Sequence, residues 1–250
     1  HEITGRAPGR RTYREVAALG LALVLAGALR RRGTRRLRAA FLLAVVGVFG
    51  VWLNVQYSMV QLHAALHPPW ARPELSLGFI LLAGVPLYVL LFGNMYCGWL
   101  CPFGALQELV GELRPARWVT EPGMTARRWA RYVKFFLLFL AVMLWAFRPD
   151  AALYETDPLT GFFDRSWGRL FTAGAAILAL SFFFRRFWCR YLCPVGAFLS
   201  LLGSVHVFRR FWPPVVPPWC DLGVRSQADL DCLSCNRCRH VSGPPPGGRR

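Results

Sequence analysis

The chain has 250 residues, of which 55% are hydrophobic, and its mean hydropathy is +0.34. These values are too apolar for an ordinary soluble domain and indicate a membrane protein. The net charge of +17 comes almost wholly from arginine, since Lys134 is the only lysine. The arginines flank apolar runs, as in the cytoplasmic loops of membrane proteins, and this pattern argues against nucleic-acid binding.

The first part of the chain contains two strong candidate membrane spans. It begins with an N-terminal segment, 1–38, in which the apolar run 16–29 is short for a span and the loop 30–38 carries six arginines. Residues 39–62 and 76–96 are the predicted spans. The second of them leads directly into a pair of cysteines.

The second part of the chain follows the same order. The helix after Pro102 is amphipathic, so we expect it to lie at the membrane interface with its polar residues in solvent. Further spans are predicted at 131–147 and 168–187, and the latter again leads into a cysteine pair. An apolar helix, 195–208, follows, and the polar stretch 209–241 contains four more cysteines.

The repeated order predicts the fold class. A basic loop, a span, a weakly charged or acidic loop, a span, a cysteine pair, a proline and a helix occur twice, with an offset of 92 residues. We expect an all-α, polytopic membrane helix bundle of about five spans, built from two parallel repeats at 39–115 and 116–208. A small irregular cysteine-rich tail, 209–250, completes it. The positive-inside rule places the Arg-rich loops, both cysteine pairs and the tail in the cytoplasm.

The two cysteine pairs share one motif. Cys97 begins CGWLCPFGA and Cys189 begins CRYLCPVGA, and both read C-x-aromatic-L-C-P-x-G-A. Proline suits the first position of a helix, so Cys101 and Cys193 should lie at helix N-termini, which favour thiolate. The four thiols could jointly bind a metal or cluster, cycle between dithiol and disulfide, or close the path to the tail. Soft ligands favour iron or copper, and a buried structural role is the alternative.

The tail carries the second cysteine group. Cys232, Cys235 and Cys238 have the spacing C-x-x-C-x-x-C, which suits three ligands of one [4Fe–4S] cluster, and Cys220 is the candidate fourth ligand. A cysteine from a partner or from an extension of the chain is the alternative. Zinc would prefer two C-x-x-C pairs, and disulfides do not suit a cytoplasmic tail. Arg190 and Arg239 could favour a reduced cluster or anchor lipid headgroups.

These motifs resemble a known family. CGWLCPFGALQELVG, residues 97–111, and CRYLCPVGAFL, residues 189–199, resemble the membrane half of NosR-type and NapH-type polyferredoxins. The resemblance extends from about residue 39 to 240. It implies a bacterial inner-membrane protein that passes electrons between a quinone or flavin donor and a reductase or its maturation system. NosR-type proteins usually carry an N-terminal FMN-binding domain outside the membrane, and we expect FMN here only on a partner or on a domain outside this sequence.

We therefore expect a membrane electron-transfer protein with membrane lipid, a quinone- or flavin-containing donor subunit and a reductase system as its partners. Because electrons move without proton transfer by the protein, no catalytic acid–base residue is required. The rival interpretations are a cupric or other metal reductase, a metal-site assembly or regulatory factor, and a thiol–disulfide carrier.

Overall fold

The computed structural model describes residues 10–32, 34–66, 78, 80–113, 115, 124–148, 157–163, 168–205, 207, 220, 224, 229–235 and 238. The regular elements of these residues are all helical, in agreement with the predicted all-α class. In chain order they are α1 (Arg10–Arg32), α2 (Arg35–Val45), η1 (Val46–Trp52), α3 (Met59–Leu66), η2 (Ile80–Gly84), α5 (Val85–Phe92), η3 (Tyr96–Leu100), α6 (Pro102–Glu112), α7 (Met124–Phe147), α8 (Pro158–Phe163), α9 (Arg169–Phe183), η6 (Trp188–Leu192) and α10 (Pro194–Ser204).

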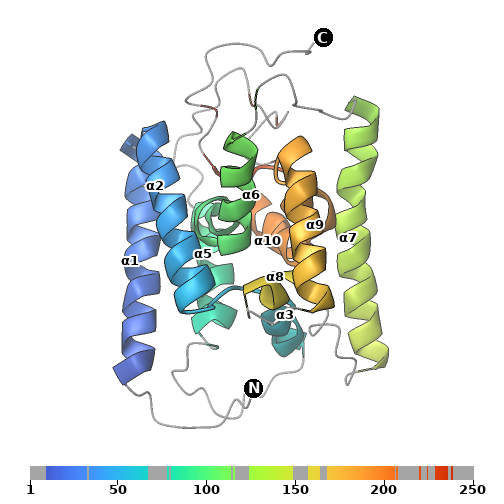
Figure 1. Ribbon diagram of the computed structural model, residues 1–250. Coiled ribbons are helices and arrows are strands. Elements are labelled where there is room, and N and C mark those ends of the chain that lie inside the picture. Colours follow the sequence, from blue (N-terminus) through green and yellow to red (C-terminus); the bar gives the residue numbers. More distant parts are fainter. Residues whose placement is uncertain are drawn as a thin grey trace.

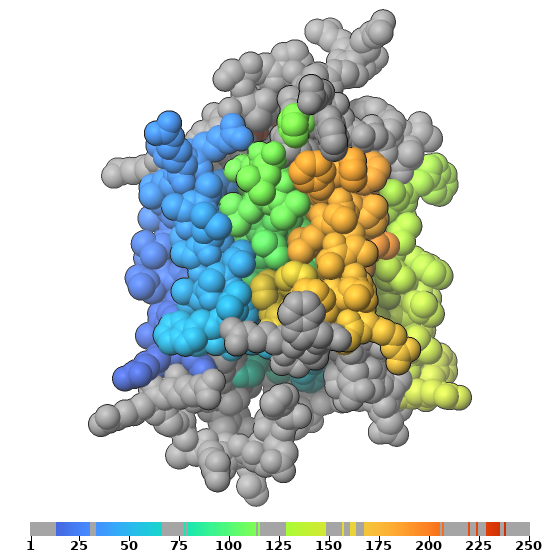
Figure 2. Space-filling view, viewed as in Figure 1, coloured from blue at the N-terminus to red at the C-terminus, as the bar shows by residue number. Residues whose placement is uncertain are grey.

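The helices form a bundle with the cysteine motifs at its centre. In Figure 1, α1 and α2 lie on one side and α7 on the other, with α5, α6, α9 and α10 between them. The short helices α3 and α8 lie at one end. Figure 2 shows α2, α6 and α9 side by side on one face of the molecule. The interior is filled by large side chains such as Trp99, Phe103 and Leu199, each at most 2% exposed.

The outer helices bury one stripe each, as amphipathic helices do. In α1 the buried side chains are Leu19, Ala22, Ala26 and Arg30, which recur every three or four residues. The turn into α2 is capped by Thr34, whose side chain accepts a hydrogen bond from a backbone N–H of the first turn. α1 therefore ends, and α2 begins, in the arginine-rich segment 30–38. The buried stripe of each helix faces the interior of the bundle.

The predicted span 39–62 is not a single helix. The helix ends at Trp52 and residues 53–58 are not helical before α3 begins. Asn54 has a φ of 49°, a left-handed conformation that asparagine tolerates better than most residues. The amide of Met59 donates to the Asp157 carboxylate (3.2 Å), so the break is stabilised by a polar contact that hydropathy does not reveal.

Only one of the expected spans has the length and composition of a membrane helix among the residues described. It is Trp129–Phe147 in α7, close to the predicted 131–147. The other apolar helices, Ile80–Phe92, Arg169–Phe183 and Pro194–Ser204, are shorter. The division of the chain into four parts remains a prediction.

We expected the polar residues of the helix after Pro102 to face solvent, and this prediction is wrong, although α6 itself lies on one face of the bundle (Figure 2). α6 packs against α2, α9 and η1, and its residues 102–105, 107 and 108 are buried. The polar side chains Gln107 and Glu108 are 0% and 3% exposed. The polar stripe of α6 faces polar partners inside the protein rather than solvent.

Candidate metal centre

Both C-x-x-x-C-P motifs have the same local structure. A π-helical turn, η3 or η6, contains the first cysteine, and the second cysteine is the N-cap of α6 or α10. The Sγ atom of Cys101 accepts the amide of Gly104 (3.4 Å), and that of Cys193 accepts the amide of Gly196 (3.2 Å). The prediction that these cysteines lie at helix N-termini, with proline in the first turn, is confirmed.

The four thiols of these motifs are buried and lie close to one another. Cys97, Cys101, Cys189 and Cys193 are each at most 7% exposed, and they are near enough to interact electrostatically across the two motifs. A Cβ on Gly104 would lie 3.5 Å from the Sγ atom of Cys189. The two motifs therefore face each other at the centre of the bundle.

A residue just before each motif contacts the helix that follows the other motif. The side chain of Asn94, just before the first motif, donates to the hydroxyl of Ser200 in α10 (3.3 Å). At the equivalent positions 92 residues away, Arg186 donates to Glu108 in α6. Each motif thus contacts the helix of the other, through a neutral pair in one case and a charged pair in the other.

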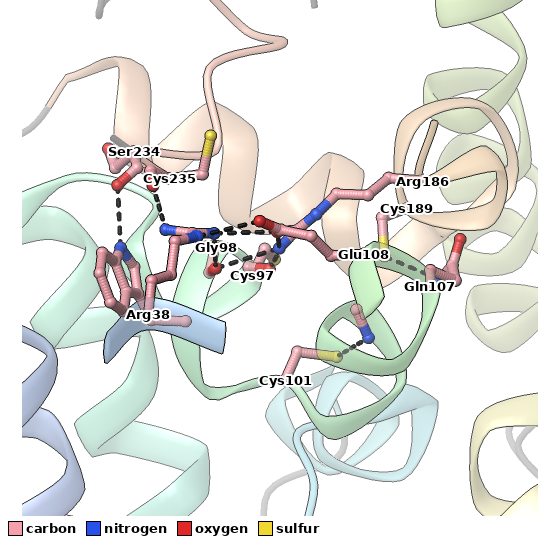
Figure 3. A network of polar contacts seen from close by, with 12 residues as sticks. Arg38, Cys97, Gly98, Cys101, Gln107, Glu108, Arg186, Cys189, Ser234 and Cys235 are labelled. Atoms are coloured by element: carbon pink, nitrogen blue, oxygen red, sulfur yellow. Dashed lines mark hydrogen bonds and ion pairs between the residues drawn. The ribbon is translucent and has the colours of Figure 1, made fainter. Parts of the chain in front are cut away.

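The charged pair belongs to a larger buried network (Figure 3). Glu108 receives two hydrogen bonds from Arg38, both of 2.9 Å, as well as the contact from Arg186. Arg186 also donates to the carbonyl oxygens of Cys97 (2.6 Å) and Gly98 (3.1 Å), and Arg38 donates to that of Gly98 (3.1 Å). The guanidinium group of Arg38 lies 4.4 Å from the ring centroid of Trp99.

The same network holds the tail against the first motif. Arg38 donates to the carbonyl of Cys235, and the indole N–H of Trp99 donates to the carbonyl of Ser234 (3.1 Å). Figure 3 shows these contacts on one side of Arg38 and Glu108 on the other. A Cβ on Gly98 would clash with the carbonyl oxygen of Leu233, so the tail approaches the motif as closely as glycine allows.

A second contact ties the tail to α7. The ammonium group of Lys134 is 1% exposed and lies 3.1 Å from the carboxylate of Asp231. Because an unpaired buried ammonium is costly, this pair fixes the segment just before Cys232. Lys134 lies inside a predicted span, and no local sequence pattern indicated its partner.

The thiols of the tail lie near one another but do not surround a single metal-binding position. Cys220, Cys232 and Cys235 interact electrostatically, and Cys238 is half-buried. Burial raises the pKa of the Cys232 thiol to about 12. Among the residues described, no three His, Cys, Asp or Glu side chains converge to hold a single metal ion, and all eight cysteines are free thiols. Four soft thiol donors are the ligand type that an iron–sulfur cluster uses, with each thiolate bound to a different iron atom. That these four cysteines share one cluster stays a prediction from their spacing.

The comparisons with known proteins agree with this donor chemistry. A family described as "4Fe-4S binding domain" matches residues 76–120 and 166–213. Each matched stretch contains one C-x-x-x-C-P motif, and the four tail cysteines lie outside both. No solved structure matches the chain at a significant level.

Several curated proteins are similar to the chain. Protein NirI of Paracoccus denitrificans is 33% identical over 92% of this chain and 35% of its own length. Regulatory protein NosR of Pseudomonas aeruginosa is 34% identical over 88% of this chain and 31% of its length. The putative electron transport protein YccM of Escherichia coli is 26% identical over 74% of this chain and 49% of its length. The chain thus spans about a third of NirI and NosR.

The helical bundle contains the two stretches that match a 4Fe-4S binding domain, which places the chain among the ferredoxin-type iron–sulfur proteins. More particularly, the chain belongs to the NosR/NapH type of ferredoxin-like membrane proteins, as its motifs suggested.

The sequence did not reveal the polar residues that connect the two cysteine groups. Arg38, Glu108 and Arg186 are separated by 70 and 78 residues along the chain, and no local pattern pairs them. Arg190, for which the sequence left open a role near a reduced cluster or as a lipid anchor, is buried at 5% exposure, and Arg239 lies outside the described residues. The repeated motif offers one signal for these residues. Alignment of its two copies shows that Glu108 and Arg186 replace the neutral residues Ser200 and Asn94.

Proposed function

We propose that this chain is the membrane electron-transfer part of a larger respiratory-type system and relays electrons between a quinol or flavin donor and a reductase system. Cys220, Cys232, Cys235 and Cys238 would hold one [4Fe–4S] cluster. Cys97, Cys101, Cys189 and Cys193 would form a second iron–sulfur or copper site. When bound, such groups supply one-electron acceptors, and the protein positions them and excludes water.

The main support for this proposal is the packing of the tail against the first motif. The backbone of Leu233 contacts Gly98, and the carbonyl of Cys235 shares Arg38 with that of Gly98. The thiols of the tail and the thiols of the first motif are therefore on segments whose backbones are in direct contact. Such an arrangement suits electron transfer between two bound groups better than it suits separate structural roles.

The orientation is proposed from the same contacts. Arg38 belongs to the arginine-rich start of α2 and binds the tail directly. Because the positive-inside rule favours a cytoplasmic location for arginine-rich segments, these contacts support a cytoplasmic side of a bacterial inner membrane for the tail and both motifs. The donor, which would carry any flavin, and the reductase are partners outside this chain.

Anaerobic purification of the full chain with iron and sulfide analysis and low-temperature EPR tests the proposal. About four irons per chain indicate one cubane, and about eight indicate a second on the motif cysteines. Cys232→Ser should abolish the tail signal, and Cys97→Ser should affect only the second site. A colourless protein that holds zinc instead would overturn the electron-transfer assignment.

The cluster of four buried motif thiols favours a second candidate, a cupric reductase that uses these thiols directly. It predicts copper binding that is lost in Cys97→Ser and Cys193→Ser while the tail iron is retained. Equal copper binding by the wild type and both variants would exclude it.

A further inference from the structure

The network around Glu108 carries an excess of positive charge. Arg38 and Arg186 contribute two cationic groups and Glu108 one anionic group, and their side chains are 5%, 4% and 1% exposed. Because water is excluded, the excess charge is screened far less than a charge on the surface. It acts on whatever group lies nearby.

The excess charge lies between the two cysteine groups. On one side the guanidinium groups bind the carbonyls of Cys97 and Gly98, and on the other Arg38 binds the carbonyl of Cys235. Arg186 also interacts electrostatically with the Cys235 thiol. A negative charge added at either group of thiols would therefore be stabilised.

Packing alone does not require charge at this place. The equivalent contact of the other copy joins Asn94 to Ser200 through neutral groups and connects the same two kinds of element. A buried ion pair also costs desolvation energy that a neutral pair avoids. The charged version is the one that contacts the described residues of the tail, through Arg38 and Cys235, which links it to the tail rather than to the fold.

We propose that Arg38 and Arg186, held in place by Glu108, are positioning residues that raise the reduction potential of the iron–sulfur group at the tail cysteines. The inference rests on the proposed function. One electron from a reduced donor, a quinol or a flavin, adds one negative charge at this group, and no bond to the protein forms or breaks. The excess positive charge stabilises that charge and makes the electron easier to accept.

The test compares charge changes of opposite sign. Arg186→Gln should lower the reduction potential and Glu108→Gln should raise it, each by about a tenfold change in the redox equilibrium constant, or about 59 mV for one electron. The potentials are measured by EPR-monitored titration of the full chain, with iron content determined in parallel. Arg186→Lys keeps the charge but not the forked contact, so its potential should stay close to that of the wild type.

Arg36→Gln is the matched control, because Arg36 is exposed on the same helix as Arg38 and its charge is screened by solvent. Its potential should not change. Shifts of the same sign in Arg186→Gln and Glu108→Gln, or no shift in either while iron is retained, would refute the inference. If Arg186→Gln loses iron, the decision rests on Glu108→Gln and Arg186→Lys. A wild-type chain without iron would instead refute the proposed function.

Discussion

Gly98→Ala should release the tail from the first cysteine motif. The new Cβ would lie well inside van der Waals contact of the carbonyl oxygen of Leu233, and 3.4 Å from the Cα atom of Cys235. These are backbone atoms, so no side-chain rotation relieves the clash. The equivalent position of the second motif is Arg190, in the π-helical turn η6, which shows that the turn itself accepts a side chain.

The cost of releasing the tail can be worked out from its contacts. The hydrogen bond from Trp99 to Ser234 contributes about 0.5–1.5 kcal/mol, and the charge-assisted bond from Arg38 to Cys235 about 1.5–3 kcal/mol. Burial of Leu233, which is 5% exposed, contributes about 1.5–3 kcal/mol. The docked state should therefore lose about 3.5–7.5 kcal/mol, which corresponds to a change of at least several hundredfold in the docking equilibrium.

Hydrogen exchange of the amides between residues 229 and 235 measures this loss directly. Their protection should fall by at least several hundredfold in Gly98→Ala, while the protection of α7 stays unchanged. Gly27→Ala is the control, because Gly27 lies within α1 and no atom comes within 4 Å of the position that a Cβ would take there, so the change should be neutral or slightly stabilising. Wild-type protection in Gly98→Ala would refute the argument that the tail is seated on this glycine.

The remaining predictions concern polar contacts around the two cysteine groups. Gln107→Leu removes the amide that donates to the Sγ atom of Cys189 (3.3 Å) and should cost about 1–3 kcal/mol in urea unfolding; an unchanged midpoint would contradict it. Asp231→Asn leaves the buried ammonium of Lys134 unpaired and should cost about 3–5 kcal/mol, seen as a lower Tm, with recovery in a double variant that also carries Lys134→Met. Because burial raises the pKa of Cys232 to about 12, its thiol is protonated at neutral pH, and metal binding must release that proton. Cobalt affinity of the apo tail should therefore rise with pH, and Cys232→Ser should reduce that slope by about one proton.

Local features of the fold could be predicted from the sequence. The apolar runs and the arginines between them indicated a helical membrane protein, and proline after the second cysteine indicated a helix start. The structure places Cys101 and Cys193 at those N-termini. The all-α class and these helix starts are confirmed, whereas the membrane location stays a prediction. The helix starts could be predicted because each depends on residues within one turn of the position concerned.

Non-local features could not be predicted in this way. The amphipathic pattern of α6 shows that one stripe is polar, but it does not say whether that stripe meets solvent or a partner such as Arg38. The break at residues 53–58 was missed because hydropathy averaged over a span does not register the contact between Met59 and Asp157. In both cases the deciding partner lies about 70 residues or more away in the sequence.

The differences between the two motifs carry more functional information than their identities. Cysteine, proline and glycine recur at both because the local turn and helix start require them. Where the copies differ, the first has Gly98 and Glu108 and the second has Arg190 and Ser200. Two identical motifs would offer the tail two equivalent packing sites. Because Gly98 in the first motif is replaced by Arg190 in the second, the tail can pack closely only against the first. The asymmetry therefore determines which cysteine pair the tail thiols adjoin. The electron relay that we propose needs such a defined neighbour, because the rate of transfer depends on a fixed separation.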